Sequence, residues 1–294
     1  MITCNLMGGL GNQLFQIFTT ISYAIEHKEQ LAFVAWKNLG SGLTKTRKTY
    51  WNTLLAGLAP ILKEKINFDY IIKESGFSYS PLKNPDSDKF KICMLYGYFQ
   101  SWKYFNTYFS QICQIICLEK QKEEVCKVVR NFFKEPLENC ISMHFRIGDY
   151  KNLQDQYNIL NGAYYKASLK TILGSETREE KSFERKTFEK KASHIVYFCE
   201  EHDLEEVLQI VLQLKTEFLD YAFVRADPRI DDWQQMLMMS CCRHNIIANS
   251  TFSWWGAYLN SRPNKIVCYP GQWFSQRNNK MVIDDLIPES WIKH

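Results

Sequence analysis

The sequence predicts an α/β protein with two domains. Short apolar runs typical of strands alternate with longer segments typical of helices along most of the chain. The chain has 294 residues, 46% of them hydrophobic, so it can bury a large core. This length suits two domains better than one. We place the domain junction at Pro136, which gives an N-terminal domain of residues 1–136 and a C-terminal domain of residues 137–294.

The composition argues against several classes of protein. A net charge of +4 is too mild for a nucleic-acid binder, which concentrates Lys and Arg in one patch. No apolar run reaches the roughly 20 residues that cross a bilayer, and the N-terminus lacks the pattern of a signal peptide. We therefore expect a cytoplasmic protein with at most peripheral membrane contact. The ten cysteines include no Cys-x-x-Cys pair and are expected to be reduced.

The N-terminal segment predicts a strand, a glycine turn and a helix. Residues 2–6 are typical of a strand and residues 14–27 of a helix, with three glycines close together between them. Such a turn lets backbone N–H groups approach a phosphate at a helix N-terminus. A dinucleotide-binding fingerprint would place a third glycine where Leu14 stands, so a nicotinamide cofactor is disfavoured.

Strand–helix alternation continues to the C-terminus. We expect a strand at residues 92–98 and a helix at residues 118–137, followed by the strand that starts the second domain. Residues 174–193 are mostly charged or polar without apolar periodicity, which is typical of a solvated loop. A strand at residues 195–199 then leads into an amphipathic helix whose N-terminal cap is Asp203.

Residues 141–150 predict a strand that ends in ionisable groups. Period-2 alternation sends Ser142, His144 and Arg146 to one face and four apolar side chains to the other. Those apolar residues are Ile141, Met143, Phe145 and Ile147. Parallel sheets bind ligands at the carboxyl ends of their strands, where a guanidinium can hold a phosphate bidentately, so Arg146 is a candidate anion-binding residue. The alternative is a structural ion pair between Arg146 and Asp149 that closes the loop.

A polar turn between a buried strand and an aromatic helix is a second candidate for phosphate binding. Residues 246–248 suit the strand, and Ser250, Thr251 and Ser253 follow it. Small hydroxyl groups there can bond phosphate oxygens beside the exposed N–H groups of the helix. The alternative is ordinary helix capping. Asn249-Ser250-Thr251 also matches a glycosylation acceptor, which carries little weight without a secretory signal.

Two acidic segments raise the question of a metal site. Asp86-Ser87-Asp88 is an acidic pair of a kind that can hold a metal ion, but it follows Pro85 in a polar stretch that favours a surface turn. The acids of residues 200–203 stand at a helix start, where carboxylates complement the helix dipole. We therefore expect no metal site.

Four ordered motifs make the chain resemble the alpha-1,2-fucosyltransferases, a glycosyltransferase family 11-like group. The motifs are Gly8-Gly9-Leu10-Gly11-Asn12-Gln13-Leu14-Phe15-Gln16, Gly97-Tyr98-Phe99-Gln100-Ser101, His144-Phe145-Arg146-Ile147-Gly148-Asp149-Tyr150 and Ser250-Thr251-Phe252-Ser253-Trp254-Trp255. The resemblance implies a GT-B fold of two Rossmann-like domains facing a central cleft. It also implies GDP-fucose as donor, a terminal β-galactoside as acceptor at its 2-hydroxyl, an inverting mechanism, no cofactor and no essential metal.

The resemblance also implies roles for individual residues. The C-terminal domain should bind GDP-fucose, and the N-terminal domain should form the acceptor side, with Asn12 approaching the donor from there. The expected catalytic residues are Arg146, Asp149 and Asn12, and the expected donor-binding residues are His144, Arg146, Ser250, Thr251, Gly9, Gly11, Asn12, Phe252 and Asp232. Asp149 is the carboxylate nearest to Arg146 in the sequence, but pairing with a cation would make it a poor base.

The chain departs from the family pattern at several positions. Ile147 stands where relatives usually have a second arginine, Trp102 where they often have Glu, and Cys199-Glu200-Glu201 where they often have Ser-Asp-Asp. Gln235 falls where they often have Asp, so the residue that reads guanine is left open. Two further functions are compatible with the sequence: a GDP-fucose-dependent transferase with another acceptor, and a non-catalytic carbohydrate-binding protein.

Overall fold

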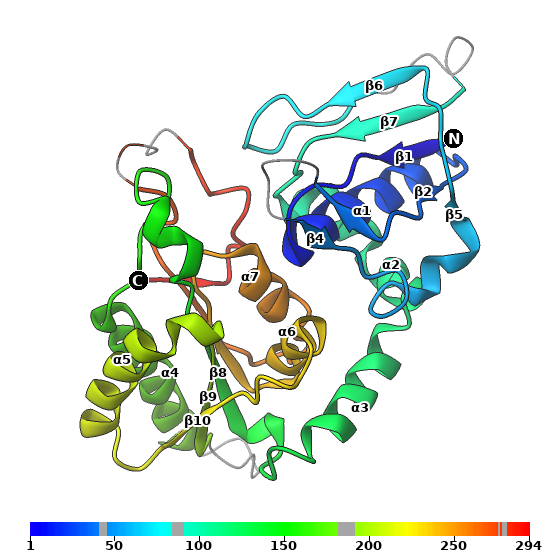
Figure 1. Cartoon of the computed structure of the whole chain (residues 1–294). Coiled ribbons are helices and arrows are strands. Elements are labelled where there is room, and N and C mark those ends of the chain that lie inside the picture. Colours follow the sequence, from blue (N-terminus) through cyan, green and yellow to red (C-terminus); the bar gives the residue numbers. More distant parts are fainter. Residues whose placement is uncertain (41–45, 84–90, 182–191, 276, 278–280) are drawn as a thin grey trace. The chain divides into compact units, whose positions relative to one another are not determined.

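The computed structural model describes residues 1–40, 46–83, 91–181, 192–275, 277 and 281–294. The chain forms two compact units (Figure 1). The first comprises Met1–Gln121 with Lys280–Glu289, and the second comprises Lys122–Asn279 with Ser290–His294. The predicted α/β class with two units is confirmed, and each unit is built around a parallel sheet.

The boundary between the units lies at Gln121 instead of Pro136. Helix α3 (Leu118–Val129) belongs mainly to the second unit, because the Lys122 ammonium is buried there and donates to the carbonyl of Leu259 at 2.7 Å. The chain also returns to the first unit near its C-terminus. Ser101 Oγ donates to the carbonyl of Asp285 at 2.6 Å, and the backbone N–H of Tyr79 donates to the Asp285 carboxylate at 2.9 Å.

The first unit has a three-stranded parallel sheet in the order β1-β7-β6. Its strands are β1 (Ile2–Cys4), β6 (Tyr70–Lys73) and β7 (Cys93–Tyr96), and two smaller ribbons pair β2 (Phe33–Val34) with β5 (Leu62–Lys63) and β3 (Asn38–Leu39) with β4 (Arg47–Lys48). Its helices are α1 (Leu10–Glu26), α2 (Phe109–Ile115) and the short 3-10 turns η1 (Ala56–Ile61), η2 (Trp102–Tyr104) and η3 (Asn106–Tyr108). Most of α1 is buried, and it starts at Leu10, before the expected Leu14. Its N-cap is Gly9, so the glycine turn runs directly into the helix.

The second unit has a six-stranded parallel sheet in the order β10-β9-β8-β11-β12-β13. The strands are β8 (Cys140–His144), β9 (His194–Phe198), β10 (Ala222–Arg225), β11 (His244–Ile246), β12 (Val267–Tyr269) and β13 (Ile292–Lys293). The helices are α3, α4 (Gly162–Lys181), α5 (Leu204–Glu217), α6 (Asp232–Cys241) and α7 (Thr251–Tyr258), with short turns η4 (Leu137–Asn139), η5 (Gly148–Asn152) and η6 (Glu201–Asp203). Helices α4 and α5 lie on one side of this sheet, and α6 and α7 on the other (Figure 1).

The expected division of β8 into two faces is confirmed. Its apolar residues Ile141 and Met143, with Phe145 and Ile147 beyond the strand, join one core cluster with side chains of α4 and α5, among them Leu169. Burial of apolar surface on this scale is the main stabilising term of the unit, at about 25 cal/mol per Å². The opposite face, with Ser142, packs on the α6 and α7 side, so β8 is buried throughout.

Two helix boundaries differ from the sequence expectation. Helix α3 ends at Val129 and not near residue 137, and Pro136 disfavours helical backbone in the residue before it. Helix α4 continues to Lys181, into the segment 174–193 whose composition predicts a loop. Within this extension Glu176 is buried and lies 2.9 Å from the guanidinium of Arg243, a contact that the order of residues in the sequence does not reveal.

Candidate active site

The guanidinium of Arg146 lies just beyond the carboxyl end of β8 and is held by two carboxylates. One terminal nitrogen, Nη2, is 2.7 Å from Asp149 Oδ1, and the other, Nη1, is paired with Glu200 Oε1. The guanidinium carbon also lies 5.4 Å from the centre of the Tyr150 ring. The Arg146 side chain is 20% exposed, so it remains partly accessible from solvent. The structural Arg146–Asp149 pair is therefore present, and it orients a cation at the edge of the sheet where parallel strands bind ligands.

Glu200 joins this site because β9 is the parallel neighbour of β8. The register pairs His144 with Phe198, so the residues that follow both strands emerge side by side. The sequence presents Glu200 as part of an acidic helix start and of the segment where relatives often have Ser-Asp-Asp, and it gives no sign of the contact with Arg146. The signal that could have found it is the order of the strands, which one sequence does not display.

Asp203 ties the same two loops together. It is the N-cap residue of α5, as expected, but its side chain makes no capping hydrogen bond with that helix. Its Oδ2 instead accepts a hydrogen bond from the backbone N–H of Gly148 at 2.8 Å, and its side chain is fully buried. A side chain at Gly148 would bring its Cβ within 3.0 Å of His202 Nε2, so the loop after β8 passes close to the loop after β9.

His144 is buried on the same edge and carries an unsatisfied ring nitrogen. The residue is 7% exposed, its ring lies 5.5 Å from that of Phe252, and Nδ1 has no hydrogen-bond partner among the described residues. Burial, with a smaller contribution from the nearby Arg146 cation, lowers the pKa of His144 to about 3. The imidazole is thus neutral near pH 7, and its Nδ1 is a buried polar atom without a partner among the described residues.

Ser250 caps helix α7 at the carboxyl end of β11. Its Oγ accepts a hydrogen bond from the backbone N–H of Phe252 at 3.3 Å, and Ser253 Oγ accepts one from the backbone N–H of Ala248 at 3.2 Å. The structure therefore shows Ser250 as a helix cap, the alternative that the sequence left open. Thr251 opens the helix and is half-buried. The first turn of α7 directs its backbone N–H groups toward this edge, as a phosphate would require.

Asn249, the acceptor position of the glycosylation-like triplet, is fully buried. Its amide donates to the carbonyls of Asn158 and Trp273, each at 2.9 Å. The folded protein therefore hides this side chain, and its role is to fix the turn before Ser250.

Asp232 opens helix α6, and Asp231 beside it forms a capping box with Gln234. Asp232 Oδ1 accepts a hydrogen bond from the backbone N–H of Trp233 at 2.8 Å. The amide of Gln235, where relatives often have Asp, donates to the carbonyl of Ile230 at 2.8 Å. These contacts explain the helix start, and they assign no residue to base recognition.

In the first unit, Asn12 lies in the first turn of α1 beside the glycine turn. Asn12 Oδ1 accepts a hydrogen bond from Gln100 Nε2 at 2.9 Å. Gly8 has a left-handed φ of 77°, and a Cβ there would lie 2.6 Å from Asn12 Nδ2. The N-cap of α1 is Gly9, so Asn12 does not cap this helix. Gly11 is buried within the helix, and Gln100 brings the second motif into contact with the first.

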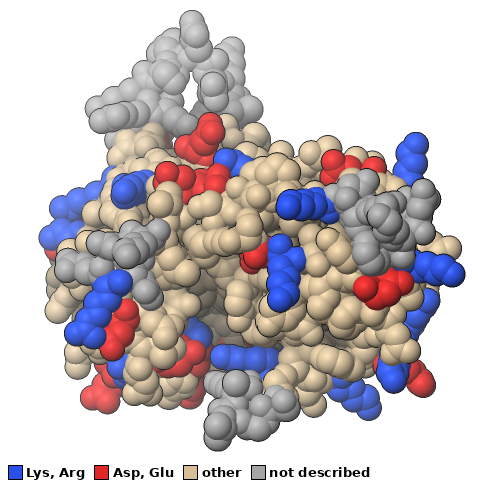
Figure 2. Space-filling view, turned by 90° about the horizontal axis from the view of Figure 1, so that it is seen from above, with Lys and Arg blue, Asp and Glu red and all other residues tan. Residues whose placement is uncertain are grey.

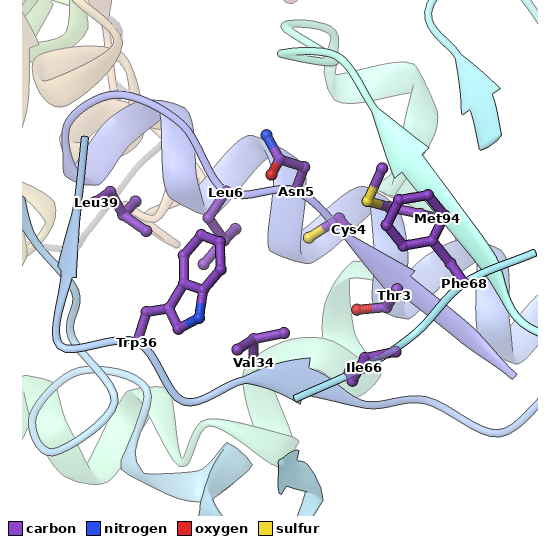
Figure 3. A pocket seen from close by; sticks show the side chains of 10 residues that line it. All are labelled: Thr3, Cys4, Asn5, Leu6, Val34, Trp36, Leu39, Ile66, Phe68 and Met94. Carbon is purple, nitrogen blue, oxygen red and sulfur yellow. The ribbon is translucent and has the colours of Figure 1, made fainter. Parts of the chain in front are cut away.

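A cavity of about 100 Å³ opens near the carboxyl end of β1 (Figure 3). Asn5 and Leu6 line it from the strand end, and the rings of Trp36 and Phe68 stand at its sides. Trp36 and Phe68 are 50% and 44% exposed. Trp102, at a position where relatives often have Glu, starts the turn η2 elsewhere in the unit.

The described residues also bear on the excluded classes of protein. On the face shown in Figure 2, basic and acidic side chains are interspersed instead of forming one basic patch. No helix among the described residues is long and apolar enough to cross a membrane. In that part of the chain, no group of three or more His, Cys, Asp or Glu side chains could hold a metal ion. Asp86 and Asp88 lie outside the described residues.

Comparison with known proteins places this arrangement in context. The family model described as Glycosyl transferase family 11 matches residues 1–293. An alpha-1,2-colitosyltransferase from Escherichia coli is 23% identical over 317 aligned residues, covering 100% of this chain and 98% of the relative. The O-antigen biosynthesis glycosyltransferase WbnK from the same species is 25% identical over 210 residues, 67% of this chain and 59% of the relative. A solved structure of an Arabidopsis thaliana FUT1 variant in complex with GDP is 10% identical, with a TM-score of 0.46 over 91% of this chain and 70% of that one.

Proposed function

Because the chain belongs to glycosyl transferase family 11, we propose that it transfers L-fucose from GDP-fucose to the 2-hydroxyl of a terminal β-galactoside. The transfer inverts the configuration at the anomeric carbon. The protein is a glycosyltransferase by its family, and the sugar and the acceptor are the proposed part. The observation that carries the proposal is the Arg146 guanidinium, oriented by Asp149 and Glu200 at the carboxyl edge of the larger sheet.

Arg146 supplies the charge that the departing GDP needs. As the bond between the anomeric carbon and the phosphate oxygen breaks, negative charge grows on the diphosphate, and a preorganised cation lowers the energy of that state. One such donor is worth roughly 3 to 4 kcal/mol in comparable sites. Asp149 and Glu200 fix the guanidinium before the donor arrives, so little of this energy is lost in reorientation. Asp149 is then a positioning residue, since its carboxylate is paired with the guanidinium.

His144, Ser250 and Thr251 complete the proposed donor site. The unsatisfied Nδ1 of His144 is a buried polar atom that a nucleotide group can satisfy, and the neutral ring adds no charge against Arg146. The N-terminus of α7 offers backbone N–H groups to phosphate oxygens, and Ser250 Oγ can accept or donate there. Phe252 packs on the His144 ring and holds it in place.

Asn12 is the proposed contribution of the first unit to the donor. Its Oδ1 is engaged by Gln100, which orients the amide and fixes which end carries the N–H groups. An amide oriented in this way can donate to the sugar or the diphosphate. Gly9, the N-cap of α1, and Gly11, buried in the first turn of that helix, are the other proposed donor-binding residues of this unit.

A colitosyl donor is the second candidate. A relative that matches this chain over its whole length is an alpha-1,2-colitosyltransferase. The groups described above act on the diphosphate and the nucleotide, so they serve either sugar. They are equally compatible with fucosyl transfer to a different acceptor and with carbohydrate binding that is not followed by transfer.

The test is a transfer assay with purified protein. GDP-fucose and GDP-colitose are each offered with a panel of β-galactosides, and release of GDP is compared with formation of the glycoside product. We expect fucosyl transfer to the 2-hydroxyl, identified by the linkage of the product. Transfer only from the colitosyl donor would favour the second candidate, a colitosyltransferase. Donor binding without any product would support a non-catalytic, carbohydrate-binding role.

A further inference from the structure

The carboxylates around Arg146 already have structural roles. Asp149 and Glu200 are paired with the guanidinium, and the side chain of Asp203 is fully buried and accepts the backbone N–H of Gly148. Asp149 and Glu200 thus balance the charge of the cation, and Asp203 is out of reach of an acceptor sugar. The first unit, which the family resemblance assigns to the acceptor, offers a further candidate for the base that takes the proton of the acceptor hydroxyl.

Glu74 stands at the carboxyl edge of the sheet in the first unit. It directly follows β6, and its backbone N–H donates to the carbonyl of Tyr96 at 3.0 Å, so it extends the pairing of β6 with β7. The described residues that directly follow the three strands are 5–9, 74–83 and 97–101, and Glu74 is the only carboxylate among them. Ligands of parallel sheets bind at this edge.

The carboxylate of Glu74 is held by the second sequence motif. Its Oε2 accepts the backbone N–H of Tyr98 at 2.7 Å, and the N–H of Phe99 also bonds this carboxyl group. A Cβ at Gly97 would lie 2.6 Å from Oε2, so the chain passes too close to Glu74 for any larger residue there. The Gly97-Tyr98-Phe99 segment therefore forms a close-fitting backbone seat for one carboxyl group.

The seat is connected to Asn12 and includes strained backbone. Gln100, two residues after Tyr98, donates to Asn12 Oδ1 at 2.9 Å. Phe99 has a left-handed φ of 52°, which is costly for a residue with a bulky side chain. Strain of this kind concentrates at functional sites, where surrounding contacts maintain it. Glu74 and Asn12 are thus positioned by adjacent parts of one short loop.

The surroundings of Glu74 suit a base. Burial raises the pKa of its carboxyl group even though the two backbone N–H bonds act in the opposite direction. One titratable group near it is a phenol, the Tyr104 hydroxyl, which is close enough for Glu74 to raise its pKa. Tyr98 contacts Glu74 through its backbone N–H. Tyr96 and Tyr98 are each 43% exposed, and aromatic rings of this kind offer a surface for the apolar face of a sugar.

We propose that Glu74 is the general base of the transfer, an inference that rests on the proposed function. Its carboxylate takes the proton of the attacking acceptor hydroxyl. The hydroxyl oxygen forms the new bond to the anomeric carbon, and the bond from that carbon to the diphosphate oxygen breaks with its electron pair leaving on GDP. The products are the glycoside, GDP and a protonated Glu74 that solvent deprotonates.

The competing explanation is that Glu74 only supports the strained loop. Glu74→Gln separates the two, because the amide oxygen can still accept the Tyr98 N–H but cannot take a proton at neutral pH. Glu64→Gln, at an exposed site beside β5, is the matched control for the loss of one carboxylate from the same unit. All measurements use the full chain.

The experiment compares kcat, KM for the donor, GDP affinity, melting temperature and pH dependence in the three proteins. We expect Glu74→Gln to lower kcat about 100-fold or more, since general bases contribute roughly 10² to 10⁴. KM for the donor, GDP affinity and melting temperature should stay near the wild-type values. The remaining activity of the variant should no longer decrease as the pH is lowered. The control should match the wild type throughout.

Two results would overturn the inference. A near-normal kcat in Glu74→Gln, with activity that still decreases at acidic pH as in the wild type, would exclude a role as base. A drop in melting temperature or GDP affinity that parallels the loss of kcat would leave only the supporting role. The proposed function is judged separately by wild-type turnover and product linkage, so an active wild type with an active Glu74→Gln rejects this inference alone.

Discussion

The carboxylate of Asp203 accepts a hydrogen bond from the backbone N–H of Gly148, and this 2.8 Å contact joins the loops that follow β9 and β8. Both loops supply partners of Arg146, Glu200 from one and Asp149 from the other. The position of the guanidinium therefore depends on a buried hydrogen bond that does not touch it.

Asp203→Ala should destabilise the second unit by about 1–3 kcal/mol, the usual cost of leaving a buried donor unsatisfied. It should also weaken GDP binding, because the two loops around Arg146 lose their connection. Thermal unfolding and calorimetry with GDP measure the two effects. Asp203→Asn keeps an acceptor oxygen and should retain most of both properties. Equal losses in the two variants would mean that charge, and not the hydrogen bond, matters at this position.

Arg146→Ala should reduce turnover by about 10²- to 10³-fold, the loss seen when one preorganised donor is removed. Stability should change little, since the guanidinium is partly exposed and its partners Asp149 and Glu200 can be hydrated. Arg146→Lys should fail to restore full activity because an ammonium cannot bridge two carboxylates and a phosphate in one plane. Kinetics with the nucleotide-sugar donor, beside circular dichroism, test both variants. Near-normal turnover in Arg146→Ala would show that the pair with Asp149 is only structural.

His144 should make stability depend on pH. Burial lowers its folded pKa to about 3, whereas the unfolded value is 6.5. Between these values the unfolded chain binds a proton that the folded chain does not. Stability should therefore fall as the pH drops from 6.5 toward 3, with a slope of up to about 1.4 kcal/mol per pH unit from this residue.

His144→Gln should lack that contribution, so the stability difference between wild type and variant should shrink at acidic pH. Thermal unfolding of both proteins at about pH 7 and about pH 5 provides the comparison. A difference that does not change with pH would mean that His144 is hydrated in solution and titrates near its ordinary value.

The parts of the site that depend on local pattern can be predicted from the sequence. The two faces of β8 follow from strict alternation between Ile141 and Ile147, and the core cluster confirms them. The strand-to-helix turn at Ser250 is predictable for a similar reason, since a buried strand leads through hydroxyl residues into an aromatic helix.

Other features of the site depend on contacts between distant parts of the chain. Glu200 meets Arg146 only because β9 pairs with β8. Glu176, in the charged segment into which α4 extends, meets Arg243 from a distant part of the chain. Glu74 has no motif of its own, and its setting becomes visible only when β7 brings Gly97 against it. Periodicity contains no information on strand order, so none of these contacts could be derived from it.

Transfer activity should persist in excess EDTA. Arg146 and the N–H groups of α7 are the proposed partners of the departing diphosphate, so no divalent ion is needed to balance its charge. Divalent ions can still speed release of GDP. The assay compares turnover in EDTA, and after addition of Mn²⁺, with turnover in untreated buffer. Activity that disappears in EDTA and returns with Mn²⁺ would direct attention to Asp86 and Asp88.

Asn12→Ala should lower turnover more than it weakens binding of free GDP. GDP should depend chiefly on Arg146 and the Ser250 turn, whereas Asn12 would act on the donor during transfer, and interactions made mainly in the transition state lower kcat when lost. The measurements are calorimetry with GDP and kinetics with the nucleotide-sugar donor. Gln100→Ala is the matched control, because it removes the 2.9 Å hydrogen bond to Asn12 Oδ1 but leaves the amide in place. If both variants lose turnover equally, Asn12 serves to hold the loop of residues 97–101. A lowered melting temperature in Asn12→Ala with unchanged turnover would leave it a purely structural role.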